Sequence, residues 1–145
     1  MTDQARQPID PPVDAIIMAA GKGTRMNSEL PKVLLDVYGK PMVQWVVDAC
    51  LQAGCDRVIV VIGFKGDQVK AALSQYEQCY FVEQTQQLGT GHAVMMANDL
   101  FDPSTSRDVF VLGGDGPLIR AQTLDQLLQV HREGNFPASL ATAVI

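Results

Sequence analysis

The chain contains one unbroken run of β-branched residues, Val58-Ile59-Val60-Val61-Ile62, which Gly63 bounds on its carboxyl side. β-Branched residues favour strands, and this run does not alternate with polar residues. A strand without such alternation is typical of a sheet that is covered on both faces, as parallel sheets are. The run therefore predicts a buried strand of a parallel sheet.

Strand-like and helix-like segments alternate on both sides of this run. Further strands are expected at 15–20, 80–82, 109–112 and 139–145, the third of them buried, and helices at 42–50, 67–74, 91–100 and 123–133. Pro41 would open the first helix and Thr90 would cap the third, because these residue types favour those positions. The alternation predicts an α/β, Rossmann-like fold with a mostly parallel sheet flanked by helices. Ligands of such folds bind beyond the carboxyl ends of the strands, so the chemistry is expected in the loops there.

The composition limits the classes of function. The chain has 145 residues, which fits one domain at about 100–200 residues per domain. Its 11 Lys and Arg against 16 Asp and Glu give a net charge of −5. An acidic chain is a poor candidate for a nucleic-acid binder, whose affinity comes from neutralising phosphates, although a local cluster of cations could hold a phosphorylated small molecule. No apolar run approaches the roughly 20 residues that a membrane helix needs.

The cysteines and the first residues bear on the compartment. Cys50, Cys55 and Cys79 are scattered, so they are expected to be buried reduced thiols and neither disulfides nor zinc ligands. Residues 1–13 contain prolines and charges but no apolar core, which predicts a flexible leader before a domain at 14–145, and no signal peptide. Together these features predict a cytoplasmic protein.

A glycine-containing loop follows the first expected strand, with the sequence Ala19-Ala20-Gly21-Lys22-Gly23-Thr24-Arg25-Met26. Small residues let the backbone approach a ligand closely, and consecutive N–H groups can cradle a phosphate. The loop is no dinucleotide fingerprint, because Met26 stands at the third glycine position, and no P-loop, because no Gly-Lys-Ser/Thr closes it. Lys22, Arg25 and Lys32 add positive charge, which suits a triphosphate. The alternative is a Gly-rich turn with solvated basic residues.

Two later loops also carry polar residues. Asp115 follows the strand expected at 109–112, at a strand tip where one carboxylate and substrate phosphates could hold Mg²⁺; the alternative is an Asp-Gly-Pro turn. The loop at 83–92 contains glutamines that could read the edge of a base, and the alternative is a polar loop with a Thr cap. His92 and His131 have no partner at ligand spacing and are expected to be structural or surface residues.

Taken together, these loops resemble a known family. Residues 19–26, with Leu30-Pro31-Lys32-Val33-Leu34 and Gly39-Lys40-Pro41-Met42, closely resemble the signature of the sugar-phosphate nucleotidylyltransferases. Gln84, the run at 87–93 and Gly114-Asp115 with Pro117-Leu118-Ile119 resemble the uridylyltransferase domain that makes UDP-N-acetylglucosamine. The resemblance runs from Asp14 to the end of the chain and implies the nucleotide-diphospho-sugar transferase fold.

The resemblance also implies a reaction and its site residues. A sugar 1-phosphate, by the resemblance N-acetylglucosamine 1-phosphate, would attack the α phosphorus of UTP with Mg²⁺ as cofactor, and pyrophosphate would leave. Arg25 and Lys32 would be catalytic, Arg25 at the β and γ phosphates and Lys32 at the α phosphate, while Asp115 would bind the metal. The nucleotide would contact Met18, Ala19, Ala20, Gly21, Gly23, Thr24, Gln84, Gly89, Thr90 and Gly114.

Two features depart from the family pattern. Gly113 stands where the resembled domains carry Tyr, and Gly116 where they carry an apolar residue. The identity of the acceptor sugar therefore stays open. The sequence also leaves the oligomeric state open. The family domain is also longer, so residues 14–145 are expected to be its nucleotide-binding part without the acceptor portion. The alternatives are a pyrophosphorylase for another nucleoside triphosphate or sugar, and a nucleotide-binding module without turnover.

Overall fold

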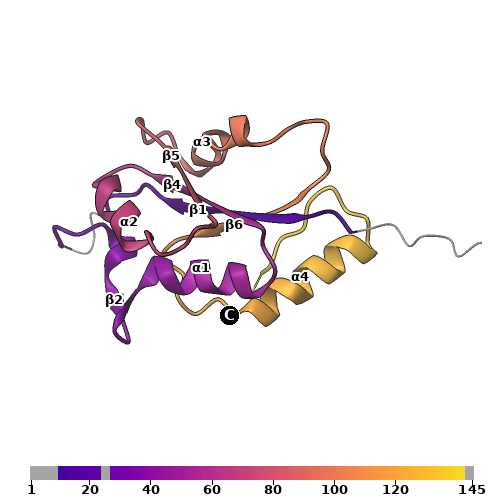
Figure 1. Cartoon of the computed structure of the whole chain (residues 1–145), viewed down its shortest axis with the longest axis horizontal. Coiled ribbons are helices and arrows are strands. Elements are labelled where there is room, and N and C mark those ends of the chain that lie inside the picture. The colour runs from indigo at the N-terminus through magenta and orange to yellow at the C-terminus, as the bar shows by residue number, and fades with distance from the viewer. Residues whose placement is uncertain (1–9, 24–26, 143–145) are drawn as a thin grey trace, which may run out of the picture.

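The structure, a computed structural model, describes residues 10–23 and 27–142 (Figure 1). Its main sheet has four parallel strands in the order β5-β4-β1-β6. These strands are β1 (Val13–Ala19), β4 (Arg57–Ile62), β5 (Cys79–Glu83) and β6 (Asp108–Gly113). The short antiparallel strands β2 (Asp36–Val37) and β3 (Lys40–Pro41) form a separate hairpin. The predicted parallel sheet is confirmed, and the β-branched run lies in β4, a central strand.

Helices cover both faces of this sheet, as Figure 1 shows. The helices α1 (Met42–Gln52), α2 (Gly66–Ala72) and α4 (Ala121–Glu133) lie on one face, and α3 (Thr90–Met95) lies on the other. Residues 10–23 and 27–142 also contain the short 3₁₀ helices η2 (Lys32–Leu34) and η3 (Asn98–Leu100). In the described part of the chain, no helix is long and apolar enough to cross a membrane.

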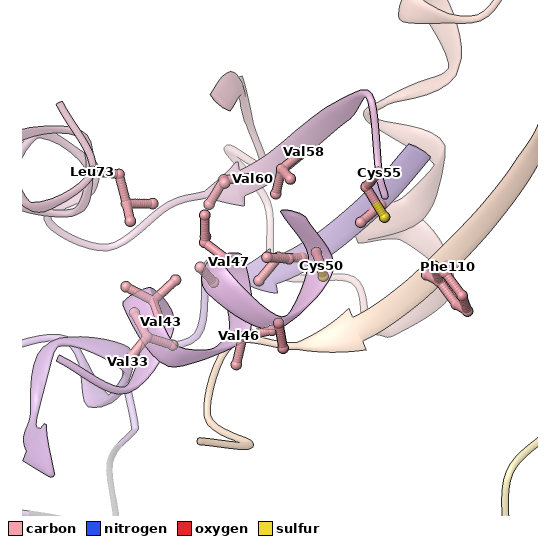
Figure 2. Close-up of a cluster of buried hydrophobic side chains, with 14 of the residues drawn as sticks. Val33, Val43, Val46, Val47, Cys50, Cys55, Val58, Val60, Leu73 and Phe110 are labelled. Atoms are coloured by element: carbon pink, nitrogen blue, oxygen red, sulfur yellow. The ribbon is translucent and has the colours of Figure 1, made fainter. Parts of the chain in front are cut away.

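The side chains of β4 alternate between two hydrophobic cores. Val58, Val60 and Ile62 join the larger core, where Figure 2 shows the first two beside side chains of α1. Ile59 and Val61 join the smaller core on the α3 side. All five side chains are at most 1% exposed, which explains why no polar residue interrupts the run.

Strand β6 is less buried than its sequence predicts. Phe110 packs into the larger core, but Val109 is 39% exposed and Val111 is 50% exposed. The reason is position, because β6 is the last strand in the sheet order. The strand expected at 139–145 is wrong for residues 139–142, which form none, and residues 143–145 lie outside the described part. Instead, Ser139 Oγ lies 2.9 Å from His131 Nδ1 of α4, which holds this segment to the helix.

The third helix also differs from its predicted form. The expected segment 91–100 splits into α3 and η3, and Thr90 does not cap α3 but is its first residue. The capping residue is Gly89, because its carbonyl accepts the first helical bond from the N–H of Ala93 at 3.1 Å. No side chain caps this helix.

A buried carboxylate lies at the amino end of β1, far along the strand from the glycine-containing loop. Asp14 is fully buried and accepts hydrogen bonds from Arg57 Nη2 at 2.6 Å and from Arg107 Nε at 2.6 Å. Burial raises the pKa of Asp14, but the two guanidinium groups outweigh it and hold the pKa below its ordinary value. The sequence analysis did not predict this cluster, which joins the amino ends of three segments of the sheet.

The three cysteines are free thiols, as predicted. Cys50 and Cys55 are buried, but Cys79 is only half-buried, since it begins the outer strand β5. The neighbouring Cys55 and burial raise the pKa of Cys50, and burial raises the pKa of Cys79 to about 11. Cys50 and Cys79 are therefore protonated at neutral pH, which disfavours nucleophilic chemistry there.

Candidate functional site

A pocket of about 310 Å³ lies at the carboxyl ends of the parallel strands. Loops that follow β1, β5 and β6 meet there, as expected for an open α/β sheet. The pocket is lined by Met18, Ala19, Ala20, Gly21, Gly23, Lys32, Val33, Gln84, Gln87, Gly89, Thr90, Ala93, Gly113 and Asp115. The structure thus brings together all but three of the predicted site residues.

The three exceptions have different reasons. Thr24 and Arg25 lie outside the described residues. Gly114 is buried behind the pocket wall, where its N–H donates to the carbonyl of Met18 at 2.9 Å. A Cβ on Gly114 would lie 3.0 Å from Val33 Cγ1, so this glycine lets the β6 loop pack closely against the pocket.

An ion pair lines the pocket. Lys32 Nζ donates to Asp115 Oδ2 at 2.7 Å, and the two side chains are 39% and 44% exposed. The hydrogen bond from Lys32 lowers the pKa of Asp115 although burial opposes it, so the carboxylate is ionised at neutral pH. The pocket therefore presents one positive and one negative group side by side, both within reach of solvent and of a ligand.

Lys32 owes its place to two local features. It begins η2, whose turn is closed by a hydrogen bond from the N–H of Leu35 to the carbonyl of Lys32 at 3.1 Å. Gly23 has φ +64°, and a Cβ there would lie 2.6 Å from the Cβ of Lys32. The glycine-containing loop can therefore pack against Lys32 only because residue 23 has no side chain.

The loop after β5 is tied to the loop after β1. The amide nitrogen of Gln87 donates to the carbonyl of Ala20 at 2.5 Å. Gln84 is only 5% exposed, and its amide nitrogen contacts the carbonyl of Gly89 at 3.1 Å. These bonds hold the polar loop at the pocket that Lys32 and Asp115 also line.

The sequence analysis did not select four of the lining residues, namely Val33, Gln87, Ala93 and Gly113. Gln87 belongs to the glutamine-containing loop, so its residue type was a usable signal. Gly113 entered only as a departure from a family pattern, and a Cβ there would lie 2.8 Å from Asp115 Oδ1. Val33 and Ala93 are small apolar residues of ordinary type, and only the fold places them at the pocket.

The described residues contain no cluster of three or more His, Cys, Asp or Glu side chains that could hold a metal ion alone. Asp115 is the acidic residue that lines the pocket within 10–23 and 27–142. A single carboxylate still fits Mg²⁺, which proteins usually bind through one or two carboxylates together with substrate phosphates. The donor set therefore suits a cation that arrives with a phosphorylated ligand.

A larger hollow, of about 630 Å³, lies between β6, α4 and residues 137–141. Its walls are mainly apolar side chains such as Phe110, Leu124 and Leu127. The pocket of about 310 Å³ is the better candidate for chemistry. It combines the ion pair of Lys32 and Asp115, a loop whose backbone a ligand can approach closely, and the buried side-chain amide of Gln84.

Comparison with known proteins shows what the chain is similar to. The chain is 43% identical over 133 residues to the bifunctional protein GlmU of Picosynechococcus sp., which covers 90% of this chain and 29% of that protein. It is 50% identical over 119 residues to the bifunctional protein GlmU of Psychrobacter sp., covering 82% and 26%. The chain thus spans less than a third of the length of these curated relatives.

Among solved structures, a nucleotidyl transferase from Methanothermobacter thermautotroptrophicus has the same fold, with a TM-score of 0.68 and 24% identity. The match covers 81% of this chain and 56% of that one. The model of the MobA-like NTP transferase domain matches residues 15–144, which include every strand of the main sheet except the first two residues of β1. The chain therefore belongs to the family of MobA-like NTP transferase domains.

Proposed function

We propose that this chain binds UTP with Mg²⁺ and acts in the transfer of UMP to a sugar 1-phosphate, N-acetylglucosamine 1-phosphate, with release of pyrophosphate. The observation that carries the proposal is the pair of Lys32 and Asp115, 2.7 Å apart beside a glycine-containing loop. Phosphoryl-type transfer needs a cation, a carboxylate that can hold a metal ion, and backbone N–H groups that can approach the phosphates, and this site offers all three. The relatives named GlmU support the transferase class, and the resemblance carried by Gln84 and by the run at 87–93 suggests the sugar and the nucleotide.

The site residues have distinct roles in this proposal. Met18, Ala19, Ala20, Gly21 and Gly23 form the backbone wall beside the nucleotide. By the family resemblance, Thr24 also contacts the nucleotide and Arg25 holds the β and γ phosphates. Gln84, Gly89 and Thr90 read the base, and Gly114 supports the nucleoside pocket from behind. The cytoplasmic location stays a prediction.

Lys32 and Asp115 carry the charge of the reaction. When triphosphate binds, Lys32 exchanges its bond to Asp115 for one to the α phosphate, and Asp115 would then be the residue that holds the metal. Mg²⁺, when bound, would supply charge neutralisation at the phosphates. Lys32 then opposes the negative charge that develops as the sugar phosphate attacks in line and pyrophosphate leaves. No covalent intermediate on the protein is needed.

The test compares UTP, CTP, GTP and dTTP by calorimetry on the chain in MgCl₂, followed by a screen of sugar 1-phosphates for pyrophosphate release. We expect binding of UTP ahead of the other three, and release with N-acetylglucosamine 1-phosphate. Binding of none of them would overturn the proposal. A preference for another triphosphate would assign the chain to the alternative pyrophosphorylases, and UTP binding without release would make it a binding module.

A smaller effect is expected at Gln87. Gln87→Ala removes the hydrogen bond that joins its loop to Ala20, worth about 1 kcal/mol, so the Kd of UTP should rise about fivefold. Gln86→Ala is the matched control, since Gln86 is exposed in the same loop, and it should leave the Kd within about twofold. Equal Kd values for the two variants would show that the bond does not shape the site.

A further inference from the structure

Gln84 is unusual because it is a buried polar side chain at the edge of the pocket. Besides Asp14, it is the polar residue of the described part that is almost fully buried, with 5% exposure. Its amide nitrogen lies 3.1 Å from the carbonyl oxygen of Gly89 and 2.9 Å from His92 Nδ1. A carbonyl oxygen can only accept, so the contact with Gly89 fixes which end of the amide is the NH₂ group.

His92 completes the arrangement from helix α3. The NH₂ group of Gln84 donates one hydrogen to Gly89 and has the other left for His92 Nδ1, which must therefore accept. The proton of the neutral imidazole is then on Nε2. With both N–H groups used, Gln84 offers a ligand only its carbonyl oxygen, Oε1, which accepts no hydrogen bond from residues 10–23 and 27–142.

We propose that His92 is a positioning residue, which holds the Gln84 amide so that Oε1 accepts the N3–H group of a uracil base. The inference rests on the proposed function, and it identifies the residue that would make the site prefer uracil over other bases. Uracil has a hydrogen-bond donor at N3, whereas cytosine has an acceptor there. An amide held with its carbonyl toward N3 therefore favours uracil, and an amide that turns around favours cytosine.

Gly89 supports the same orientation from the loop. Its carbonyl accepts both from Gln84 and from the N–H of Ala93 at the start of α3, so the amide and the helix share one anchor. His92 is the third residue of this helix and is half-buried. Loss of its acceptor would leave one N–H of a buried amide unpaired, which a change of rotamer or an inverted amide would relieve.

The test measures the affinity of the chain for UTP and for CTP, each in MgCl₂, by calorimetry. His92→Leu should weaken UTP binding about tenfold and should tighten CTP binding, because the freed amide can turn its NH₂ group toward N3, where cytosine has an acceptor and uracil has a donor. His92→Asn places an amide oxygen near the position of Nδ1 and should recover UTP binding to within about threefold. His131→Leu, on α4, is the matched control and should change neither Kd.

A second measurement needs no nucleotide. The side-chain NH₂ signal of Gln84, assigned by its loss in Gln84→Glu, should exchange slowly with solvent in the parent and in His92→Asn, and faster in His92→Leu. The exchange rate reports whether the Gln84 amide is held in place. Thermal unfolding of each variant reports separately whether the substitution has damaged helix α3.

The outcomes separate the two proposals. A parent chain that binds no UTP overturns the proposed function and this inference together. A parent that prefers UTP, with a His92→Leu variant whose UTP-to-CTP preference stays within about twofold of it, overturns only the role of His92. An Asn variant as poor as the Leu variant overturns that role as well, since then the ring and not the acceptor would matter.

Discussion

Replacing Lys32 with alanine should slow pyrophosphate release from UTP by two to three orders of magnitude, while the Kd of UTP rises less than about tenfold. The difference arises because negative charge builds up on the oxygens around the α phosphorus mainly in the transition state, where a fixed cation contributes about 3–4 kcal/mol. In the free chain the ammonium group is held 2.7 Å from Asp115, so it is already placed at the pocket before a ligand binds. The rate of pyrophosphate release is compared between Lys32→Ala and a parent protein that is catalytically active. Calorimetry measures the Kd of UTP for both.

Lys70→Ala is the matched control for this substitution. Lys70 is also a partly exposed lysine, with its Nζ 3.8 Å from Glu83 Oε1, but it lies on α2 and does not line the pocket. Its removal should change the rate less than about twofold. A Lys32→Ala variant that releases pyrophosphate within about threefold of the parent would remove Lys32 from the catalytic residues and leave the family assignment intact.

That the site residues lie at one edge of the sheet could be predicted from the sequence, because it depends only on the topology of parallel strands. Lys32 and Asp115 are 83 residues apart, but each follows a strand that the sequence marks clearly. Parallel strands bring such loops to one edge, so the pattern alone predicts that the two residues share a crevice. The pattern does not give their direct contact, since that depends on how closely Gly23 and Gly114 let two loops approach.

Other features could not be predicted, because local sequence does not state the order of strands in a sheet or the partners that a residue meets far along the chain. Val109–Leu112 has the composition of a buried strand, yet β6 is last in the order and exposes Val109 and Val111. Thr90 has the residue type of a helix cap, but the carbonyl that accepts the first helical bond is that of Gly89. In the strand, tertiary position overrides local preference, whereas the helix simply begins one residue earlier than its sequence predicts.

The Asp14 cluster was missed for the same reason. An aspartate inside an apolar strand is unfavourable unless charge compensates it, and its partners Arg57 and Arg107 are 43 and 93 residues away. The cluster lies at the amino ends of the strands, and the pocket lies at their carboxyl ends. The fold thus separates a buried ion cluster that holds the sheet together from an exposed ion pair that is free to exchange partners.

Asp14→Asn should lower the free energy of unfolding by about 3 kcal/mol, which corresponds to a fall in Tm of roughly 10 °C for a domain of this size. The reason is that two guanidinium groups, each about a quarter exposed or less, lose the carboxylate that compensates their partial burial. Urea unfolding followed by circular dichroism and by Trp45 fluorescence measures the change. Asp56→Asn is the matched control, because Asp56 is 57% exposed and contacts the same Arg107 at 3.3 Å, and it should cost less than about 0.5 kcal/mol.

The dependence on pH tests whether the charge of Asp14 is the cause. Because the folded state holds the pKa of Asp14 below that of the unfolded chain, about 3.9, its contribution is fully present above that value and is lost as pH falls through the lower, folded pKa. The gap in stability between the parent and Asp14→Asn should therefore be constant from pH 7 to about pH 5 and should narrow below about pH 4. A gap that stays the same down to pH 3 would mean that the substitution acts through packing and not through the ion cluster.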